Sequence, residues 1–196
     1  MQPKTSHFAV LGWLANMPLT GYEIKQRIEQ SISFFWQESF GSIYPHLHEM
    51  EEVGWVEVSE SKRNGRLRKV YNITRQGRKA LHQWLQAPHR EEVFKNELLL
   101  KLFFGVHTAP QALLELLKIQ RKRVHEAAET YRRISEHVSA IHGDSPATPY
   151  QLLTLEYGLK GAEAELQWLQ RAEEVIRAQY ERASGTVSPW DEKDVT

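Results

Sequence analysis

The chain has 196 residues, of which 41% are hydrophobic and 26% are charged, and its formal net charge at pH 7 is zero. This composition is that of a soluble globular protein with one large domain or two small ones. No apolar run approaches the roughly 18 residues that a membrane-spanning helix needs. Cysteine is absent, which excludes disulfides and thiolate zinc sites. The first residues do not resemble a signal peptide, so a cytoplasmic protein is expected.

Three short helices are predicted at the start of the chain. The first runs from Ser6 to Ala15, where apolar residues recur at helical spacing, and it ends before Pro18 because the residue preceding a proline avoids helical angles. Thr20 caps the second helix. The third spans about 42–53 and is followed by Gly54, a typical C-terminal cap.

The sequence pattern then changes from the period of a helix to that of a strand. Residues 55–60 alternate between apolar and polar, Asn64 and Gly65 form the strongest short signal for a hairpin turn, and residues 70–73 form the returning strand. Thr74 caps a fourth helix. This order of three helices, a two-stranded hairpin and one helix predicts a winged helix-turn-helix domain.

The second half of the chain is predicted to be helical. A short helix over about 95–105 precedes two long helices, which are separated by a break at 143–146. Apolar residues of both long helices recur in alternating steps of four and three, a heptad seam that Gln120 interrupts. We therefore expect a mainly α chain with a small β-hairpin, made of a winged-helix domain at 1–86, a linker at 87–94, a helical dimerisation domain at 95–183 and a disordered tail at 184–196.

The seams of the two long helices allow two interpretations. The helices can cover each other in an internal hairpin, or they can bind a second copy of the chain. A two-helix hairpin alone has a thin core, and winged helices usually need two copies to bind a two-fold symmetric site, so a homodimer is favoured.

Basic residues concentrate at the tip of the predicted hairpin. Residues 1–90 contain 12 Lys and Arg and 8 Asp and Glu, whereas residues 91–196 contain 13 Lys and Arg and 17 Asp and Glu. Within the basic half, five of the eight residues 62–69 are Lys or Arg. Such a hairpin suits a phosphate backbone or a minor groove, and the helix before it suits a major groove; the alternative is a solvated turn. The residues expected to contact double-stranded DNA are Tyr22, Lys25, Ser39, Ser42, Tyr44, His46, Lys62, Arg63, Arg66 and Arg68.

The outer face of the third predicted helix is expected to present Ser39, Ser42, Tyr44, His46 and His48. Their hydroxyls and rings can donate hydrogen bonds to phosphates and touch base edges. The two histidines do not predict a metal site, because residues two apart on a helix point about 200° away from each other. No metal and no cofactor is expected.

Several separated motifs of the first 85 residues resemble the PadR family of transcriptional regulators. They are Leu11-Gly12, Gly21-Tyr22-Glu23, Ser42-Ile43-Tyr44-Pro45 with Leu47, Glu52 with Gly54, and Tyr71 with Ile73, Thr74 and Gly77. The second half resembles, by its architecture, the helical domain of the longer PadR type. The resemblance implies a homodimeric winged-helix regulator, often a repressor, that an aromatic or phenolic effector sometimes releases from DNA. Because His46 and His48 replace residues common in the family, base preference cannot be transferred.

Tryptophan is frequent in this chain. Trp13, Trp36 and Trp168 are the candidates for a pocket that holds a flat apolar effector, against the alternative of ordinary core packing. For Trp55 and Trp84 the core is the favoured interpretation.

No catalytic motif is present, and the carboxylates of the long helices alternate with Lys and Arg as on solvated faces, so an enzyme is not expected. The alternative to a DNA-binding regulator is a winged-helix module for protein interaction or assembly, against which the basic hairpin argues.

Overall fold

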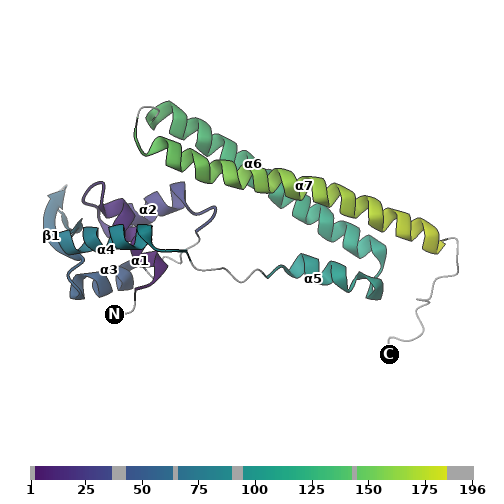
Figure 1. Cartoon of the computed structure of the whole chain (residues 1–196), viewed down its shortest axis with the longest axis horizontal. Coiled ribbons are helices and arrows are strands. Elements are labelled where there is room, and N and C mark those ends of the chain that lie inside the picture. Colours follow the sequence, from purple (N-terminus) through teal and green to yellow (C-terminus); the bar gives the residue numbers. More distant parts are fainter. Residues whose placement is uncertain (1–2, 37–42, 64–65, 90–94, 143–144, 185–196) are drawn as a thin grey trace. The chain divides into compact units, whose positions relative to one another are not determined.

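The computed structural model describes residues 3–36, 43–63, 66–89, 95–142 and 145–184 (Figure 1). The chain divides into two compact units, Met1–Glu92 and Val93–Thr196, called the N-terminal and C-terminal units below. Each unit has its own hydrophobic core. None of the helices in the described ranges is both long and apolar enough to cross a membrane.

The N-terminal unit is a winged helix-turn-helix domain, as the sequence predicts. Its elements are α1 (Thr5–Leu14), α2 (Gly21–Ser31), α3 (Ile43–Glu52), β1 (Val56–Arg63), β2 (Arg66–Ile73) and α4 (Arg75–Gln86). The strands form one antiparallel hairpin, called the wing below, whose register pairs Val56 with Ile73 at the base and Arg63 with Arg66 at the tip.

Capping side chains determine where α2 and α4 begin. The Thr20 hydroxyl accepts a hydrogen bond from the Glu23 N–H at 3.2 Å, and the Glu23 carboxylate accepts one from the Thr20 N–H at 2.8 Å. The Thr74 hydroxyl accepts from the Gly77 N–H at 3.1 Å and donates to the Gly54 carbonyl at 2.6 Å. Gly54 has a φ of 70°, the left-handed conformation that ends α3, so Thr74 ties the start of α4 to this turn.

The core of the N-terminal unit lies between α1, α2, α3 and the base of the wing. It contains one backbone pairing that the sequence pattern did not predict. Leu19 and Tyr71 exchange two backbone hydrogen bonds of 2.9 and 3.2 Å, so the segment between α1 and α2 runs beside β2 as a one-residue bridge. A single bridge leaves no alternating pattern in the sequence by which it could be found.

Trp84 is a correction to the sequence analysis. It was expected in the core, but its side chain is exposed. Its ring stacks in parallel on Phe8 at a centroid distance of 4.8 Å and therefore covers the edge of the core without being enclosed by it. Trp55 does pack against the core, as predicted.

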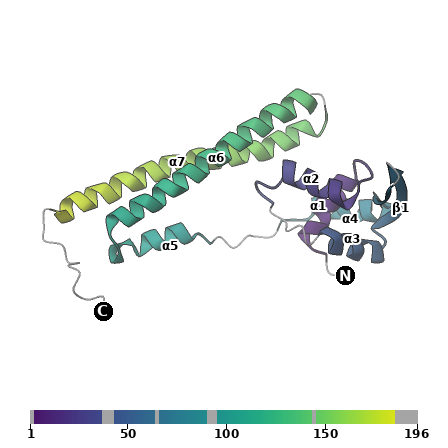
Figure 2. The same cartoon turned by 180° about the vertical axis from the view of Figure 1, so that it is seen from behind.

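The C-terminal unit is helical. Its elements are α5 (Glu97–Phe103), the short 3-10 helix η2 (Gly105–His107), α6 (Pro110–His142) and α7 (Thr148–Ser184). The two long helices lie side by side in an antiparallel pair, visible from both directions (Figures 1 and 2). Of their buried residues, Leu117, Val124, Ala162 and Leu169 follow the predicted seams, whereas Ala128 lies one position beyond the predicted seam position Ala127, which is only half-buried.

The polar residue Gln120 and the small residue Gly158 lie where α6 and α7 pack against each other. Gln120, which interrupts the heptad seam, donates a hydrogen bond to Glu165 at 2.8 Å. At Gly158 the helices approach closely, because a Cβ there would lie 2.9 Å from the ring of Tyr131. The seam thus tolerates a polar residue where the facing helix supplies an acceptor.

Gly77 gives a stability prediction for the N-terminal unit. A Cβ at this position would overlap the backbone carbonyl oxygen of Trp55, which cannot move aside as a side chain would. We expect Gly77→Ala to lower the free energy of unfolding by about 2–3 kcal/mol, measured by urea titration with Trp fluorescence.

The matched control is Gly12→Ala in α1, where no described atom lies within 4 Å of the new Cβ. Alanine is the better helix former, so this variant should be as stable as the parent or more stable, by up to about 1 kcal/mol. Equal effects of the two substitutions would contradict the close approach at Gly77.

Candidate nucleic-acid interface

The exposed face of α3 carries one large aromatic side chain, Tyr44, which is 60% exposed. Its ring lies directly on the start of α2, because a Cβ on Gly21 would be only 2.8 Å from the Tyr44 ring. Tyr22, on α2, is equally exposed, and its hydroxyl accepts a hydrogen bond from Gln26 at 3.2 Å. Two exposed tyrosines therefore lie at the joint of α2 and α3, where their phenols can reach a phosphate or a base edge.

Of the other residues predicted on these two helices, Lys25 is half-buried on α2 and His48 is exposed on α3. Ser39 and Ser42 lie outside the described residues. Tyr22 and Tyr44 are therefore both exposed, and the predicted DNA contacts of the tyrosines, Lys25 and the two serines stay predictions.

The prediction that His46 lies on the outer face of α3 is wrong. Its side chain is only 5% exposed and meets the His7 ring edge-to-face at a centroid distance of 4.7 Å. With Ile43, Leu47 and Met50 it forms the buried stripe of α3, at the i, i+3, i+4 and i+7 spacing of a core-facing helix. That spacing was present in the sequence and places His46 inside, so His46 is removed from the candidate DNA contacts.

His46 belongs to a buried cluster between α1 and α3. The Lys4 backbone N–H donates to Nδ1 of His7 at 3.0 Å, so the proton of the neutral ring is on Nε2, which donates to Glu49 at 2.9 Å. The Lys4 ammonium lies 3.2 Å from the other carboxylate oxygen of Glu49. This network connects the start of α1 to α3.

The potential ligand atoms of His7, His46 and Glu49 lie within 4.8 Å of one another, close enough to consider a metal site. A metal-bound histidine normally donates a hydrogen bond from its other ring nitrogen. In His7 that nitrogen accepts one, and the nitrogen facing Glu49 carries the proton. The arrangement therefore favours a hydrogen-bonded cluster over a metal centre.

The cluster predicts how stability depends on pH. Burial lowers the pKa of His7 below its ordinary value of 6.5, and the neighbouring His46 lowers it further, although Glu49 opposes both effects. The folded chain then binds fewer protons at His7 than the unfolded chain does, so acid favours unfolding. We expect the free energy of unfolding to fall as the pH drops below about 6.5, until the pH reaches the folded pKa.

Urea titrations at pH 7.5 and 5.5 measure this effect. His7→Gln keeps an acceptor for the Lys4 N–H and a donor for Glu49 but does not titrate, so the loss of stability in acid should be smaller in this variant. His82→Gln, on the exposed surface of α4, is the control and should behave like the parent. A His7→Gln variant with the full acid dependence of the parent would rule out His7 as the cause.

The outer half of the wing carries exposed cations. Lys62, Arg68 and Lys69 are exposed, and none of the ion pairs between described residues involves them. The backbones of Arg63 and Arg66 pair at the end of the ladder. Positive side chains that are not neutralised within the described part of the chain are available to a polyanion such as DNA.

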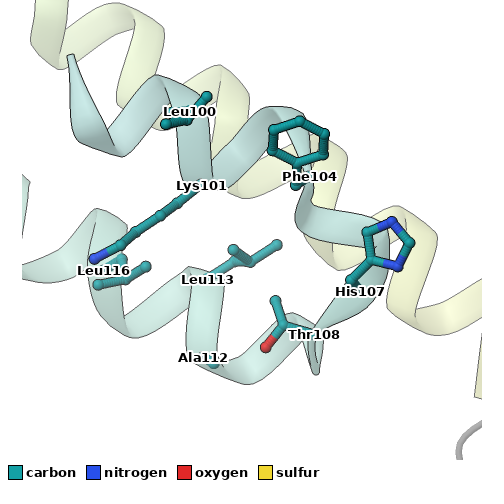
Figure 3. A pocket seen from close by; sticks show the side chains of 8 residues that line it. All are labelled: Leu100, Lys101, Phe104, His107, Thr108, Ala112, Leu113 and Leu116. Carbon is teal, nitrogen blue, oxygen red and sulfur yellow. The ribbon is translucent and has the colours of Figure 1, made fainter. Parts of the chain in front are cut away.

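The C-terminal unit has an open pocket of about 420 Å³ between α5, η2 and α6, which sequence reasoning missed (Figure 3). Leu100, Phe104, Leu113 and Leu116 form apolar walls, and Lys101 reaches across the opening from α5. The Lys101 ammonium lies 2.7 Å from Glu97 in an exposed ion pair. Apolar walls beside one cation suit a small apolar ligand that bears an acidic group.

The three predicted effector-binding tryptophans belong to different units. Trp13 and Trp36 lie in the N-terminal unit, where the Arg27 guanidinium is 5.4 Å from the centroid of the Trp13 ring. Trp168 lies on α7, is exposed and is off the seam, as predicted. A shared pocket of these three residues stays a prediction.

Two protein-family models match the chain. The model of the transcriptional regulator PadR-like family matches residues 10–83, and the model described as virulence activator alpha C-term matches residues 94–177. The N-terminal unit is therefore similar to the PadR-like family of transcriptional regulators, and the C-terminal unit is similar to the helical domain of virulence activators. The matched family and the two curated relatives below are described as regulators of transcription and not as enzymes.

Two curated proteins show that the likeness extends over most of the chain. A probable transcriptional regulator of Mycobacterium tuberculosis is 27% identical over 184 residues, covering 86% of this chain and 96% of that protein. The negative transcriptional regulator PadR of Bacillus subtilis is 26% identical over 170 residues, covering 83% and 92%.

Crystal structures of Bacillus subtilis PadR share the fold of this chain. The complex with operator DNA has a TM-score of 0.78 at 23% identity and covers 88% of this chain and 99% of that one. The complex with p-coumaric acid has a TM-score of 0.73 at 23% identity and covers 89% and 99%. A fold with a winged helix and two long helices such as α6 and α7 is therefore also found in a regulator whose structure was determined with DNA.

Proposed function

We propose that this PadR-like regulator binds operator DNA as a homodimer and represses transcription until an aromatic acid releases it. The observation that carries the DNA-binding part is the wing, whose Lys62, Arg68 and Lys69 are exposed outside the core of a winged-helix domain. Bacillus subtilis PadR, a named negative regulator, has been solved with operator DNA, which supports the same role here.

In this proposal α3 lies in the major groove and the wing contacts the backbone or the adjacent minor groove. Affinity comes mainly from the wing, including Arg63 and Arg66, because the described exposed face of α3 carries no Lys or Arg. Specificity comes from Tyr44 with Ser39 and Ser42, and Tyr22 and Lys25 contact the backbone from α2.

The homodimer is supported by apolar surface that one copy leaves exposed. Phe103 is 80% exposed at the end of α5, Tyr157 is 83% exposed on α7, and Val106 is exposed on η2. Large exposed apolar residues on a helical arm indicate an interface with another protein. The partner at this interface is a second copy of the chain, because a two-fold symmetric operator is bound by two copies.

The effector of this proposal is a small aromatic carboxylic acid. Bacillus subtilis PadR has been solved with p-coumaric acid, a molecule of this class. The pocket of α5 and α6 offers apolar walls to an aromatic ring and the Lys101 ammonium to a carboxylate. Trp13, Trp36 and Trp168 remain the predicted alternative.

Selection of duplexes from a random pool tests the DNA-binding part. We expect the chain to enrich a two-fold symmetric sequence and to bind it at least about 10³-fold more tightly than a scrambled duplex at physiological salt. If no sequence is enriched and duplex binding is absent at low salt, the chain would instead be a protein-interaction module.

Titration with p-coumarate tests the effector. It should weaken binding to the selected duplex, because a ligand changes DNA affinity only if it binds the free and DNA-bound states differently. Lys101→Met should remove this effect and Trp168→Phe should keep it. The opposite pattern would move the site to Trp168, and no effect of any phenolic acid on the parent chain would contradict the proposal.

A further inference from the structure

One residue of the wing does not fit a surface that only contacts phosphates. Leu67 lies one residue from the end of the ladder, opposite Lys62, and is 59% exposed. Its sequence neighbour Arg68 and its same-face neighbour Lys69 are exposed cations. Leu67 is thus an apolar side chain with exposed cations at its cross-strand position and at the next two positions of β2, and with the carboxylate of Glu60 opposite Lys69.

The position of Leu67 explains why the fold does not bury it. Side chains of β2 alternate between two faces, so Leu67 shares its face with Tyr71. Tyr71 is buried where the wing starts, but the ladder continues outward through Glu60 and Lys69, which are both exposed. Leu67 therefore extends past the core, and its methyl groups remain in water in the free chain.

The chemistry around Leu67 matches one kind of target. A minor groove is bordered by phosphates on both sides, which pair with flanking cations, and its floor accepts apolar side chains between base pairs. Side chains that open a base step in this way include leucine, and they partly unstack the step and bend the duplex. A lone leucine between cations has the arrangement that such an insertion needs.

We propose that Leu67 inserts into the minor groove of the operator and partly opens one base step, while Lys62, Arg68 and Lys69 hold the adjacent phosphates. This inference rests on the proposed function of DNA binding by the wing. Pyrimidine–purine steps are the easiest to unstack, so the wing adds specificity for such a step at a fixed distance from the bases that α3 contacts.

The test compares Leu67→Ala, Leu67→Met and Arg68→Ala in the full chain on the duplex selected from a random pool. A second duplex has its pyrimidine–purine steps outside the α3 footprint replaced by a stiff A-tract. We expect the parent and Leu67→Met to prefer the selected duplex by about tenfold, and Leu67→Ala to lose this preference. End-labelled duplexes should show, by energy transfer, less bending with Leu67→Ala.

Salt titrations separate this inference from the proposed function. Leu67→Ala should leave the slope of log affinity against log salt unchanged, whereas Arg68→Ala should flatten it. Because Leu67 is exposed, its alanine variant should also unfold at the same urea concentration as the parent.

If Leu67→Ala keeps the parent's preference and bending, or if the selected sequence lacks a pyrimidine–purine step, the inference is wrong although the wing binds DNA. If Arg68→Ala also leaves the slope unchanged, the wing does not bind DNA and the proposed function fails with it.

Discussion

Replacing Lys62 and Arg68 together by alanine is expected to flatten the salt dependence of operator affinity by about 3–4 units of log affinity per log salt concentration. Each phosphate contact contributes about 0.9 to this slope. Two substitutions in each copy of a homodimer remove four contacts. Both side chains are exposed on the wing and lie outside the ion pairs of the described residues, so their removal should cost the fold little.

The same variant should weaken binding to all sequences alike, because phosphate contacts carry no base information. Fluorescence anisotropy over a range of salt concentrations, on the selected and a scrambled duplex, measures both effects. Lys160→Ala is the control, since Lys160 pairs with Glu163 on α7 in the C-terminal unit. A slope in the wing variant equal to that of the control would show that the wing does not contact DNA.

Phe103→Asp and Tyr157→Asp, made separately, are each expected to convert the proposed homodimer to monomers at micromolar concentration. Both rings are more than three quarters exposed in a single copy, so neither variant should unfold it. Loss of a central aromatic contact costs about 2 kcal/mol or more, and a two-fold interface loses it twice, which raises the dimer Kd by roughly 10³-fold.

Sedimentation velocity measures the change, with Glu156→Gln as the control next to Tyr157 on α7. The monomeric variants should also bind the selected duplex more weakly, because each winged helix then binds its half-site alone. If both aspartate variants remain dimeric, the second copy covers a different face of the arm or of the winged helix.

Much of the fold was predictable from the sequence because it depends on local signals. Thr20 with Glu23, and Thr74 before α4, are capping patterns that act over three residues. Heptad spacing in α6 and α7 required only counting along the chain, and the buried residues follow it except at Ala128. Charge at the wing tip is likewise a property of consecutive residues, 62–69.

Contacts between distant segments were decided by the tertiary structure. The Leu19–Tyr71 bridge joins residues far apart in the sequence, and no local pattern marks either of them. Trp84 is apolar and at core spacing, but only the packing of α4 on Phe8 shows that it lies at an edge.

Helix α3 shows which features followed from the sequence and which were decided by the tertiary structure. The spacing of Ile43, Leu47 and Met50 was visible in the sequence and places His46 on the same stripe, although the sequence analysis assigned His46 to the outer face. What the sequence by itself determined is the winged helix, the helical arm and the charge of the wing. Only the tertiary structure brought His7 of α1 against the buried His46 ring and within hydrogen-bond distance of Glu49, because these contacts join two helices that are far apart in the sequence.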